Sequence, residues 1–266
     1  MNEHFVSERQ ALILARLRQS GRVLAQTLAE SFGVSEDTIR RDLREMAGRG
    51  ECQRVYGGAL LAESSTVPLK TRIAEDADRK ALLAAAVVPL LEAGMVVFID
   101  AGSTNLAIAR AIPVDVPLTV VTNTPAIAAE LTGRTGIDLV LIGGKVDPAV
   151  GAAIDAMALR QLELMRPDLC ILGVCGMSTE TGLSADVFED AVFKRLACSA
   201  SERVVAAITT EKLGHRAAFH VHDLSPTLSL ALERDIEQET VDVLMARGVN
   251  LRFADTSAVP IDRVQA

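Results

Sequence analysis

Apolar residues recur with a helical period along the first fifty residues of the chain. This spacing places apolar side chains on one face of a helix. It predicts three amphipathic helices, with apolar positions at Ile13, Leu14 and Leu17, then Leu24, Leu28 and Phe32, then Ile39, Leu43 and Met46. The first helix is expected over residues 8–19, where it would brace the other two.

The junction between the second and third helices carries the signals of a tight turn. Gly33 can end the second helix in the left-handed conformation. The hydroxyl of Ser35 can cap the third helix, and Glu36 and Asp37 follow where the helix dipole favours negative charge. We therefore expect two short helices joined by a Gly-Val-Ser turn.

The third helix carries Arg40, Arg41 and Arg44 on the face opposite its apolar residues. In the following run CQRVYGG, Arg54 and Tyr56 alternate with apolar neighbours before a Gly-Gly turn, which is typical of a β-hairpin. Three arginines alone would favour a small helical domain with a solvated basic face. The capped helix, tight turn, second helix and basic hairpin together favour a winged helix-turn-helix that enters the major groove of DNA.

The rest of the chain alternates between apolar, strand-like runs and helical stretches. Strands are expected at 95–100, 118–122, 138–143, 168–173, 203–209 and 249–253, and helices at 103–112, 124–132, 153–164, 186–201 and 228–246, after an Ala/Leu-rich helix that ends near Leu91. This pattern predicts an α/β fold with a mostly parallel sheet covered on both faces. Because the run ESSTVPLKTR loses periodicity, we predict a DNA-binding domain over 1–58, a linker over 59–74 and an α/β domain over 75–266.

The two parts of the chain differ in net charge. The 266-residue chain has a net charge of −8, but residues 1–58 hold nine Arg and eight Asp/Glu, which leaves −9 on residues 59–266. DNA binding must therefore depend on where the arginines lie, because the acidic remainder repels DNA. Four Cys without CxxC spacing, and a polar N-terminus, predict reduced thiols in a cytoplasmic protein.

The apolar run over residues 81–99 has the composition of a membrane span but not its continuity. Pro89, Glu92 and Gly94 interrupt it. We expect a buried helix, a turn and a strand there, and no membrane partner.

Ligands of an open parallel sheet bind beyond the carboxyl ends of its strands. There, Gly102-Ser103-Thr104 leads from a strand into a helix. Unpaired amides, two hydroxyls and a glycine suit a cradle for phosphate or carboxylate, and the same tripeptide suits an ordinary helix cap by Ser103. Neither G-x-x-x-x-G-K-[ST] nor G-x-G-x-x-G is present.

Charged residues are expected at the same edge. Lys145 and Lys212 could each bring a cation there, although a surface lysine is usually only solvated. Acids that could accept sugar hydroxyls are Asp100, Asp186, Glu189 and Asp190. Lys194 lies at i+4 from Asp190 and could simply pair with it. Near His220 and His222, no third ligand has a convincing spacing, so no metal site is predicted.

The pattern VSEDTIRRDLREM followed by RVYGGAL resembles the DeoR family of bacterial transcriptional regulators, whose N-terminal domain is a winged helix-turn-helix. The segments DAGSTNLAIA, VVTNTPAIAAEL, LIGGKV, GLSADVFEDAVFKR and TTEKLG resemble, in this order, the C-terminal effector domain of the same family. The stretch from Pro68 to Arg72 matches its P-x-x-x-R. The resemblance implies a sensor domain related in fold to ribose 5-phosphate isomerase, which typically binds a phosphorylated sugar or similar metabolite.

Residue patterns and resemblance together assign two sets of site residues. The DNA-facing set is Ser35, Thr38, Arg40, Arg41, Arg44, Arg54 and Tyr56. The effector-facing set is Asp100, Gly102, Ser103, Thr104, Asn123, Gly144, Lys145, Asp190, Lys194 and Lys212. We expect the phosphate over residues 102–104 with Lys212, or else Lys145, as its cation, and the sugar hydroxyls toward Asp100 and Asp190.

Some residues depart from the family pattern. Thr209-Thr210-Glu211-Lys212 stands where the family commonly has Asp-Ser-Ser-Lys, so the acid at position 209 is lost and one is gained beside the lysine. Residues 172–176 stand where the isomerase has Asp-Gly-Ala-Asp-Glu, and all three acids are absent. A proton-transfer isomerase needs such a carboxylate.

The sequence therefore predicts a cytoplasmic, non-enzymatic transcription factor without a cofactor, and specifically a repressor of a sugar or carbohydrate-catabolism operon. Its expected partners are double-stranded operator DNA, a phosphorylated sugar and at least one further copy of the chain, since such modules read palindromes as dimers. Two alternatives are a sugar-phosphate isomerase-like enzyme that carries a DNA-binding domain, and an interaction module that has lost its ligand.

Overall fold

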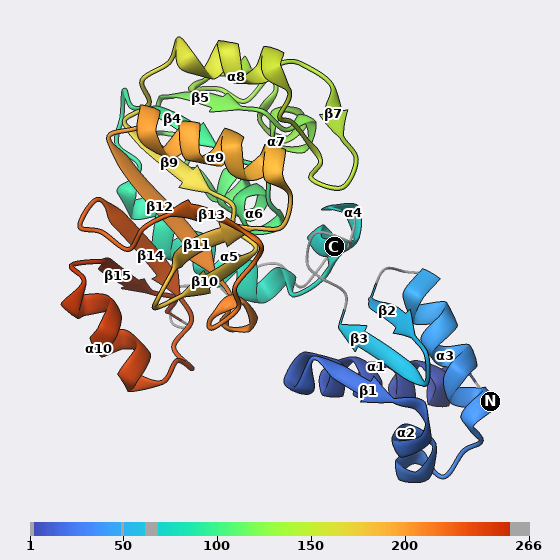
Figure 1. Ribbon diagram of the computed structural model, residues 1–266. Helices are drawn as coiled ribbons and strands as arrows, with labels where there is room; N and C mark the ends of the chain where they lie inside the picture. Colours follow the sequence, from blue (N-terminus) through green and yellow to red (C-terminus); the bar gives the residue numbers. More distant parts are fainter. Residues whose placement is uncertain (1–2, 49–50, 62–68, 256–266) are drawn as a thin grey trace. The chain divides into compact units, whose positions relative to one another are not determined.

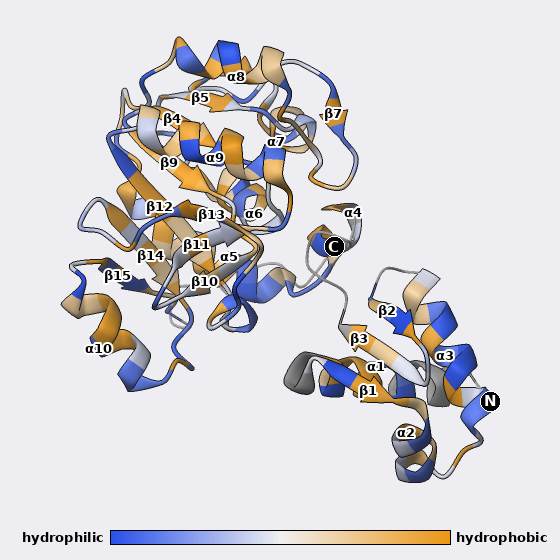
Figure 2. Ribbon diagram, viewed as in Figure 1, coloured by the Kyte–Doolittle hydropathy of each residue, from blue (hydrophilic) through white to orange (hydrophobic). Residues whose placement is uncertain are grey.

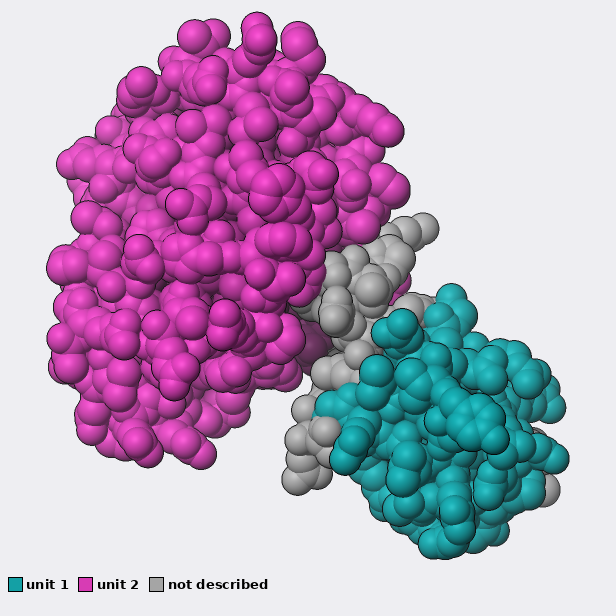
Figure 3. Space-filling model, viewed as in Figure 1, with its two compact units in different colours: residues 1–68 teal, residues 69–266 magenta. Residues whose placement is uncertain are grey.

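A computed structural model of the chain describes residues 3–48, 51–61 and 69–255. The chain divides between Pro68 and Leu69 into two units (Figure 3), each with its own hydrophobic core. The N-terminal unit contains α1 (Glu3–Ser20), β1 (Arg22–Leu24), α2 (Ala25–Phe32), α3 (Glu36–Gly48), β2 (Cys52–Val55) and β3 (Gly58–Leu61) (Figure 1).

The three predicted apolar faces build the core of the N-terminal unit, with one exception. Its buried side chains include Ile13, Leu17, Leu28, Ile39, Leu43 and Met46. The prediction was wrong for Leu24, which is 59% exposed. Leu24 ends β1 and precedes α2, so it does not share the apolar face of that helix.

The turn between α2 and α3 forms as predicted. Gly33 ends α2 with a left-handed φ of 63°. The amide of Thr38 donates to Oγ of Ser35 at 3.3 Å, so the hydroxyl caps α3. The first turn of α3 carries Glu36 and Asp37.

The wing differs from its prediction in its turn and in its number of strands. The turn is Tyr56-Gly57 rather than Gly-Gly, and Gly57 supplies the positive φ of 82°. Gly58 begins β3, where a Cβ would lie 2.0 Å from the carbonyl oxygen of Val23. This close approach lets β1, which the sequence did not reveal, pair with β3 in the order β1-β3-β2. Val55 is exposed rather than turned inward.

The second unit is an α/β domain, as predicted. Its helices are α4 (Leu69–Ala74), α5 (Ala77–Val87), η1 (Val88–Leu90), α6 (Ser103–Ala111), α7 (Pro125–Leu131), α8 (Ala156–Glu163), α9 (Phe188–Ala200), η2 (Thr210–Lys212) and α10 (Gln238–Ala246). Its main strands are β4 (Val96–Ile99), β5 (Leu118–Thr122), β6 (Ile137–Leu141), β9 (Leu169–Leu172), β12 (Arg203–Ile208), β14 (Leu228–Leu232) and β15 (Asn250–Phe253). Short strands are β7 (Val146–Asp147), β8 (Ala152–Ala153), β10 (Gly176–Ser178), β11 (Gly182–Ala185) and β13 (Phe219–His222).

The seven main strands form one parallel sheet in the order β15-β14-β12-β9-β4-β5-β6. Helices α5, α6 and α7 bury their apolar side chains against one face. The other face packs against α8, α9 and α10 and the small sheet β10-β11-β13. Because both faces are covered, the strands are apolar along their length, as the orange colour of β9 in Figure 2 shows.

Three features of this unit differ from the sequence prediction. The helix expected over 228–246 is strand β14 followed by α10; Leu228, Leu230 and Leu232 are fully buried between β12 and β15. The small sheet was not anticipated. At the ends of the predicted 59–74 linker, residues 59–61 belong to β3 and residues 69–74 form α4, while 62–68 lie outside the described residues.

The strand order reverses between β4 and β9. From β4 the chain continues through β5 to β6 on one side, and from β9 it continues through β12 to β15 on the other. Ligands of open α/β sheets bind in the crevice that such a reversal leaves at the carboxyl ends of the strands. The predicted loops after β4, β5, β6, β9 and β12 all open at that edge. Among the residues described, no helix is both long and apolar enough to cross a bilayer.

Candidate functional sites in the two units

The exposed face of α3 carries the arginines that were predicted to meet DNA. Arg40, Arg41 and Arg44 are exposed, while Ile39 and Leu43 are buried. At the start of the helix, Oγ of Ser35 lies 2.9 Å from Oγ1 of Thr38, so the two hydroxyls form a polar pair beside the arginines. The helix thus presents one basic and polar face, as the sequence indicated.

The arginines of this face differ in availability. Arg40 lies 2.7 Å from Glu36, and Arg41 lies 3.3 Å from Glu45. These pairs are exposed and therefore weak, but DNA must still compete with the two carboxylates. Among the described residues, Arg44 makes no ion pair.

The wing adds a second polar surface. Arg54 lies in β2 and Tyr56 in the turn, and both side chains are exposed. Tyr56 is the chain's only tyrosine and is fully exposed. A phenol in this position could contact a groove or a phosphate. Among the residues that the structure describes, none forms a hydrogen bond with the Tyr56 side chain.

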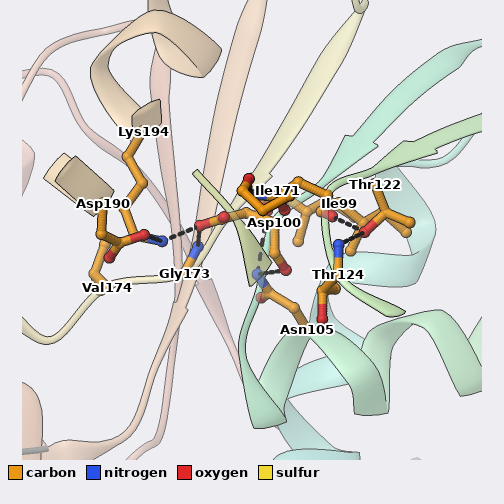
Figure 4. A network of polar contacts seen from close by, with 12 residues as sticks. Ile99, Asp100, Asn105, Thr122, Thr124, Ile171, Gly173, Val174, Asp190 and Lys194 are labelled. Atoms are coloured by element: carbon orange, nitrogen blue, oxygen red, sulfur yellow. Dashed lines mark hydrogen bonds and ion pairs between the residues drawn. The ribbon is translucent and has the colours of Figure 1, made fainter. Parts of the chain in front are cut away.

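In the second unit, Asp100 lies at the strand-order reversal and joins both sides of it (Figure 4). It follows β4 and is fully buried. Its Oδ2 accepts hydrogen bonds from the amide of Gly173, at 2.9 Å, and from Nζ of Lys194, at 2.5 Å. Gly173 must be glycine, because a Cβ would lie 2.2 Å from the carbonyl oxygen of Ala101.

Lys194 pairs with Asp190, as the i+4 alternative anticipated, and it also pairs with Asp100, which the sequence did not indicate. Nζ of Lys194 lies 3.0 Å from Oδ1 of Asp190, and both side chains are buried. Burial opposes the charge of Lys194, but the two carboxylates outweigh it and raise its pKa. Burial raises the pKa of Asp190 to about 6, since Asp100 adds to this effect and Lys194 only partly offsets it.

Three buried oxygens in this crevice have no hydrogen-bond partner among the described residues: Oδ1 of Asp100, of Asn123 and of Asp190. Oδ1 of Asp190 still lies 3.0 Å from Nζ of Lys194 as an ion pair, whereas the other two oxygens lack such a partner in the described part of the chain. Asn123 donates from Nδ2 to the carbonyl oxygen of Ala153 at 3.2 Å, which ties the β5 loop to β8. Buried polar atoms are rarely left unpaired without a reason, so the oxygens of Asp100 and Asn123 are candidate acceptors for ligand hydroxyls.

The start of α6 differs from an ordinary capped helix. The N-cap residue is Gly102, no side chain caps the helix within the described region, and the alternative of a cap by Ser103 is therefore wrong. Thr104 and Asn105 are buried, and Asn105 donates to the carbonyl oxygens of Asp100 and Ile171 at 2.9 and 3.2 Å. The first amides of a helix have no intrahelical partner, so they remain available to an anion.

The backbone conformation at Gly102 does not require a glycine. Its φ of 164° is extended, and an added Cβ would meet only the side chain of Asn105, at 3.5 Å. An alanine would therefore make an ordinary van der Waals contact with Asn105, and the fold does not require glycine here.

Gly144 and Lys145 lie apart from this cluster. The amide of Lys145 donates to Oδ2 of Asp155 at 2.8 Å, and Asp155 caps α8 through the amide of Ala158. Gly144 and Lys145 are both exposed. In the part of the chain that the structure describes, no contact joins Lys145 to Asp100, Lys194 or α6.

Lys212 does lie at the crevice, and two further cations accompany it. Its Nζ donates to the carbonyl oxygen of Val174 at 2.8 Å, directly after Gly173. Burial is the main cause that lowers its pKa, to about 8, and the positive charges of Arg72 and Lys80 lower it further. Burial lowers the pKa of Arg72, and the negative charges of Asp190 and Asp186 partly offset this effect.

Sequence reasoning missed Arg72 and Lys80 as site residues. Arg72 belongs to α4, and Lys80 to the first turns of α5, where its buried ammonium donates to the carbonyl oxygens of Arg72 and Glu75. The stretch from Pro68 to Arg72, noted only as a resemblance, was the available signal.

A cleft of about 270 Å³ opens beside Ser103, between α5 and α6. Its lining is mainly apolar: Ile73, Ala77, Lys80, Ala81, Ser103, Ala107, Arg110 and Ala111. A ligand rich in hydroxyls would leave its polar groups unpaired there. The crevice between β4 and β9 offers helix amides, cations and Oδ1 of Asp100, which has no partner among the described residues, so it matches such a ligand better.

Both units match known protein families. Residues 9–65 match the DeoR-like helix-turn-helix domain, and residues 75–231 match the DeoR C terminal sensor domain. The chain is 31% identical to the glycerol-3-phosphate regulon repressor of Escherichia coli K12, over 80% of this chain and 85% of that protein. It is 30% identical to the HTH-type transcriptional repressor GlcR of Bacillus subtilis 168, over 93% and 96% of the two chains.

Solved structures similar to the chain are more distant. Ribose 5-phosphate isomerase A of Methanocaldococcus jannaschii aligns over 51% of this chain and 54% of that one, with a TM-score of 0.39 and 16% identity. A translation initiation factor eIF-2B of Pyrococcus horikoshii aligns over 79% and 74%, with a TM-score of 0.43 and 16% identity.

Replacing Arg44 by Ala should weaken DNA binding, because this arginine is exposed and makes no ion pair with any residue that the structure describes. If Arg44 contacts a phosphate, the variant binds all sequences less tightly and the slope of log K against log salt falls by about 1. Arg160→Ala, an exposed arginine on α8, is the matched control. Gel shifts with DNA from upstream of the protein's own gene and with a scrambled duplex measure the affinity and the salt slope of each variant. If Arg44→Ala and wild type have equal affinities and equal slopes, Arg44 does not contact DNA.

Replacing Lys194 by Met should destabilise the second unit in a pH-dependent way. It leaves Asp100 and Asp190 buried without a cation, at a cost of about 3–5 kcal/mol near pH 8. Because the folded pKa of Asp190 is already raised to about 6, its proton is taken up more readily in the folded state. The deficit should therefore shrink as pH falls from 8 toward 5. Urea unfolding followed by circular dichroism measures it, with Lys145→Met as control. A deficit that does not change with pH would contradict the burial of uncompensated acids.

Proposed function

The chain belongs to the DeoR family of bacterial transcriptional regulators, and we propose that it is a repressor whose affinity for operator DNA is controlled by a phosphorylated sugar or similar metabolite in the crevice between β4 and β9. The chain is a DNA-binding regulator rather than an enzyme. The identity of its effector, and the way the effector acts, are the parts that we propose.

The observation that carries the proposal is the group of cations around Lys212. Beside the larger effect of burial, the positive charges of Arg72 and Lys80 lower the pKa of Lys212, and that of Arg72 lowers the pKa of Lys80. Bringing like charges together costs free energy, which a dianion between them would recover. A phosphate group has the charge and the number of acceptor oxygens to do so.

The surrounding groups support an orientation for the ligand. The free amides at the start of α6 favour an anion, as helix N-termini do. The carboxylate oxygens of Asp100 and Asp190 accept hydrogen bonds but repel a phosphate. We propose that the phosphate lies toward residues 102–104 and Lys212, and that the sugar hydroxyls face Asp100 and Asp190.

Helix α4 is the proposed route from ligand to DNA. It is the first described element after residues 62–68, which join the two units, and it contributes Arg72 to the cation group. A ligand shifts the DNA affinity only if it binds more tightly to one arrangement of the units than to another. A phosphate that contacts Arg72 would favour one position of α4 and so supply this difference.

A phosphorylated sugar should bind the chain, and its dephosphorylated form should bind at least tenfold more weakly. Isothermal titration would use glycerol 3-phosphate, glucose 6-phosphate, fructose 1-phosphate and ribose 5-phosphate with their parent compounds. Because Lys212 has a pKa of about 8 and is charged below it, affinity should fall about tenfold between pH 7 and pH 9. The affinity of the bare sugar should not change.

Two substitutions test the position of the phosphate. Gly102→Ala fills the space over the amides without straining the backbone, so affinity should fall while the melting temperature stays unchanged. Thr104→Val removes a donor at nearly constant volume and should cost about 1–3 kcal/mol of binding. Normal binding by both variants, or equal affinity for sugar and phosphosugar, would place the ligand elsewhere.

An isomerase-like activity has little support in the crevice. Residues 172–176 offer no carboxylate after β9, and the buried acid nearby, Asp100, is held by Lys194 and Gly173. Turnover of ribose 5-phosphate by the purified chain would overturn this view.

We also propose that the chain acts as a dimer or higher oligomer, since helix-turn-helix modules read paired half-sites about 34–36 Å apart. The full-length chain should therefore scatter light as at least a dimer at micromolar concentration and protect two half-sites in a footprint. A monomer that binds one half-site with full affinity would contradict this.

A further inference from the structure

Arg79 of α5 joins elements that are far apart in sequence. Its Nε and Nη2 donate to the two carboxylate oxygens of Glu233, after β14, each at 2.6 Å. Its Nη1 donates to Glu211 in η2. Bidentate arginine–carboxylate pairs are the most directional ion pairs in proteins. Arg79 therefore fixes η2 and the end of β14 to the same helix.

Glu233 also holds η2 directly. One of its oxygens accepts from both the amide and the hydroxyl of Thr210, at 2.7 and 2.9 Å, and the hydroxyl also lies 2.8 Å from Asp235. Because η2 is only three residues long, these contacts determine the position of Lys212 at its end. Its ammonium reaches Val174 from there.

The charge of Glu211 would otherwise oppose an anionic ligand. Burial disfavours its carboxylate, but hydrogen bonds, chiefly from Arg79, lower its pKa overall, so it stays negative beside Lys212. A carboxylate next to the proposed phosphate cation would repel a dianion. Arg79 supplies the compensating charge.

We propose that Arg79 is a positioning residue of the ligand site: it holds η2 so that Lys212 faces the end of β9, and it neutralises Glu211 so that the site accepts phosphate. This inference rests on the proposed phosphate site. The side chains of Arg79 and Glu211 are in direct contact, so their charges act as a pair.

The test compares Arg79→Met, Glu211→Gln and the double variant with wild type. Arg110→Met is the matched control, because Arg110 makes a comparable half-exposed pair with Glu130, at 3.0 Å, outside the crevice. Methionine keeps the apolar stem of arginine, so the packing loss is small. Melting temperatures of all variants establish that each is folded.

The first readout needs no ligand. Competitive acetylation with peptide mass spectrometry gives the pH at which Lys212 becomes reactive. In Arg79→Met the uncompensated Glu211 should raise this midpoint by about one pH unit, and Glu211→Gln should lower it. The double variant should lie near or below the wild-type midpoint. A merely structural role for Arg79 would leave the midpoint where it is in wild type.

The second readout is binding of inorganic phosphate and glycerol 3-phosphate by titration. Arg79→Met should lose at least tenfold in affinity, the double variant should recover most of it, and Arg110→Met should match wild type. An unchanged midpoint, or no recovery in the double variant, overturns the role of Arg79. Absence of phosphate binding in wild type would instead count against the proposed function, while the midpoints would still decide whether Arg79 positions Lys212.

Discussion

The buried charge cluster of Asp100, Lys194 and Asp190 is the interaction on which the second unit depends. One lysine compensates two carboxylates inside the protein, where an unpaired charge would be costly. Since Asp100 follows β4, accepts from Gly173 after β9 and pairs with α9, the cluster joins the two halves of the sheet where the strand order reverses. It also leaves one oxygen of Asp100 unpaired. The contacts that stabilise the crevice are thus also those that place this oxygen.

Charges of both signs meet in the crevice. Asp190 and Lys194 belong to α9, while Lys212 and Arg72 belong to η2 and α4, and the charge of Asp190 acts on Arg72. A ligand with hydroxyls at one end and a phosphate at the other matches this arrangement, whereas an apolar ligand or a simple sugar matches only part of it. The consecutive residues Arg79 and Lys80 support the cationic side, because the first holds η2 and the second holds the carbonyl groups at the end of α4.

The N-terminal unit differs from the second unit in its charge. Its surplus of one positive charge cannot attract DNA over a distance. Its contribution is local: α3 and the wing expose arginines while Glu36 and Glu45 engage two of them. Such internal pairs weaken non-specific attraction and leave affinity to depend on well-placed contacts.

The sequence by itself determined the elements whose signals are local. The face of Ile39, Leu43 and Met46, the cap by Ser35 and the left-handed Gly33 were all readable, because each depends on neighbours within one or two turns. Most strands of the large sheet were readable from their apolar runs. Strand β14 was misread as helix because Leu228, Leu230 and Leu232 precede a truly helical segment and short apolar runs fit both periods.

Only the tertiary structure decided which charges meet. Asp100 and Lys194 are 94 positions apart, and Arg79 and Glu233 are 154 apart. No periodicity connects residues at such separations; they come together because parallel strands with crossover helices bring their carboxyl ends to one edge. For the same reason the sequence could only rank Lys212 before Lys145 as the cation, while the fold brought Lys212 to the end of β9 and left Lys145 beside Asp155.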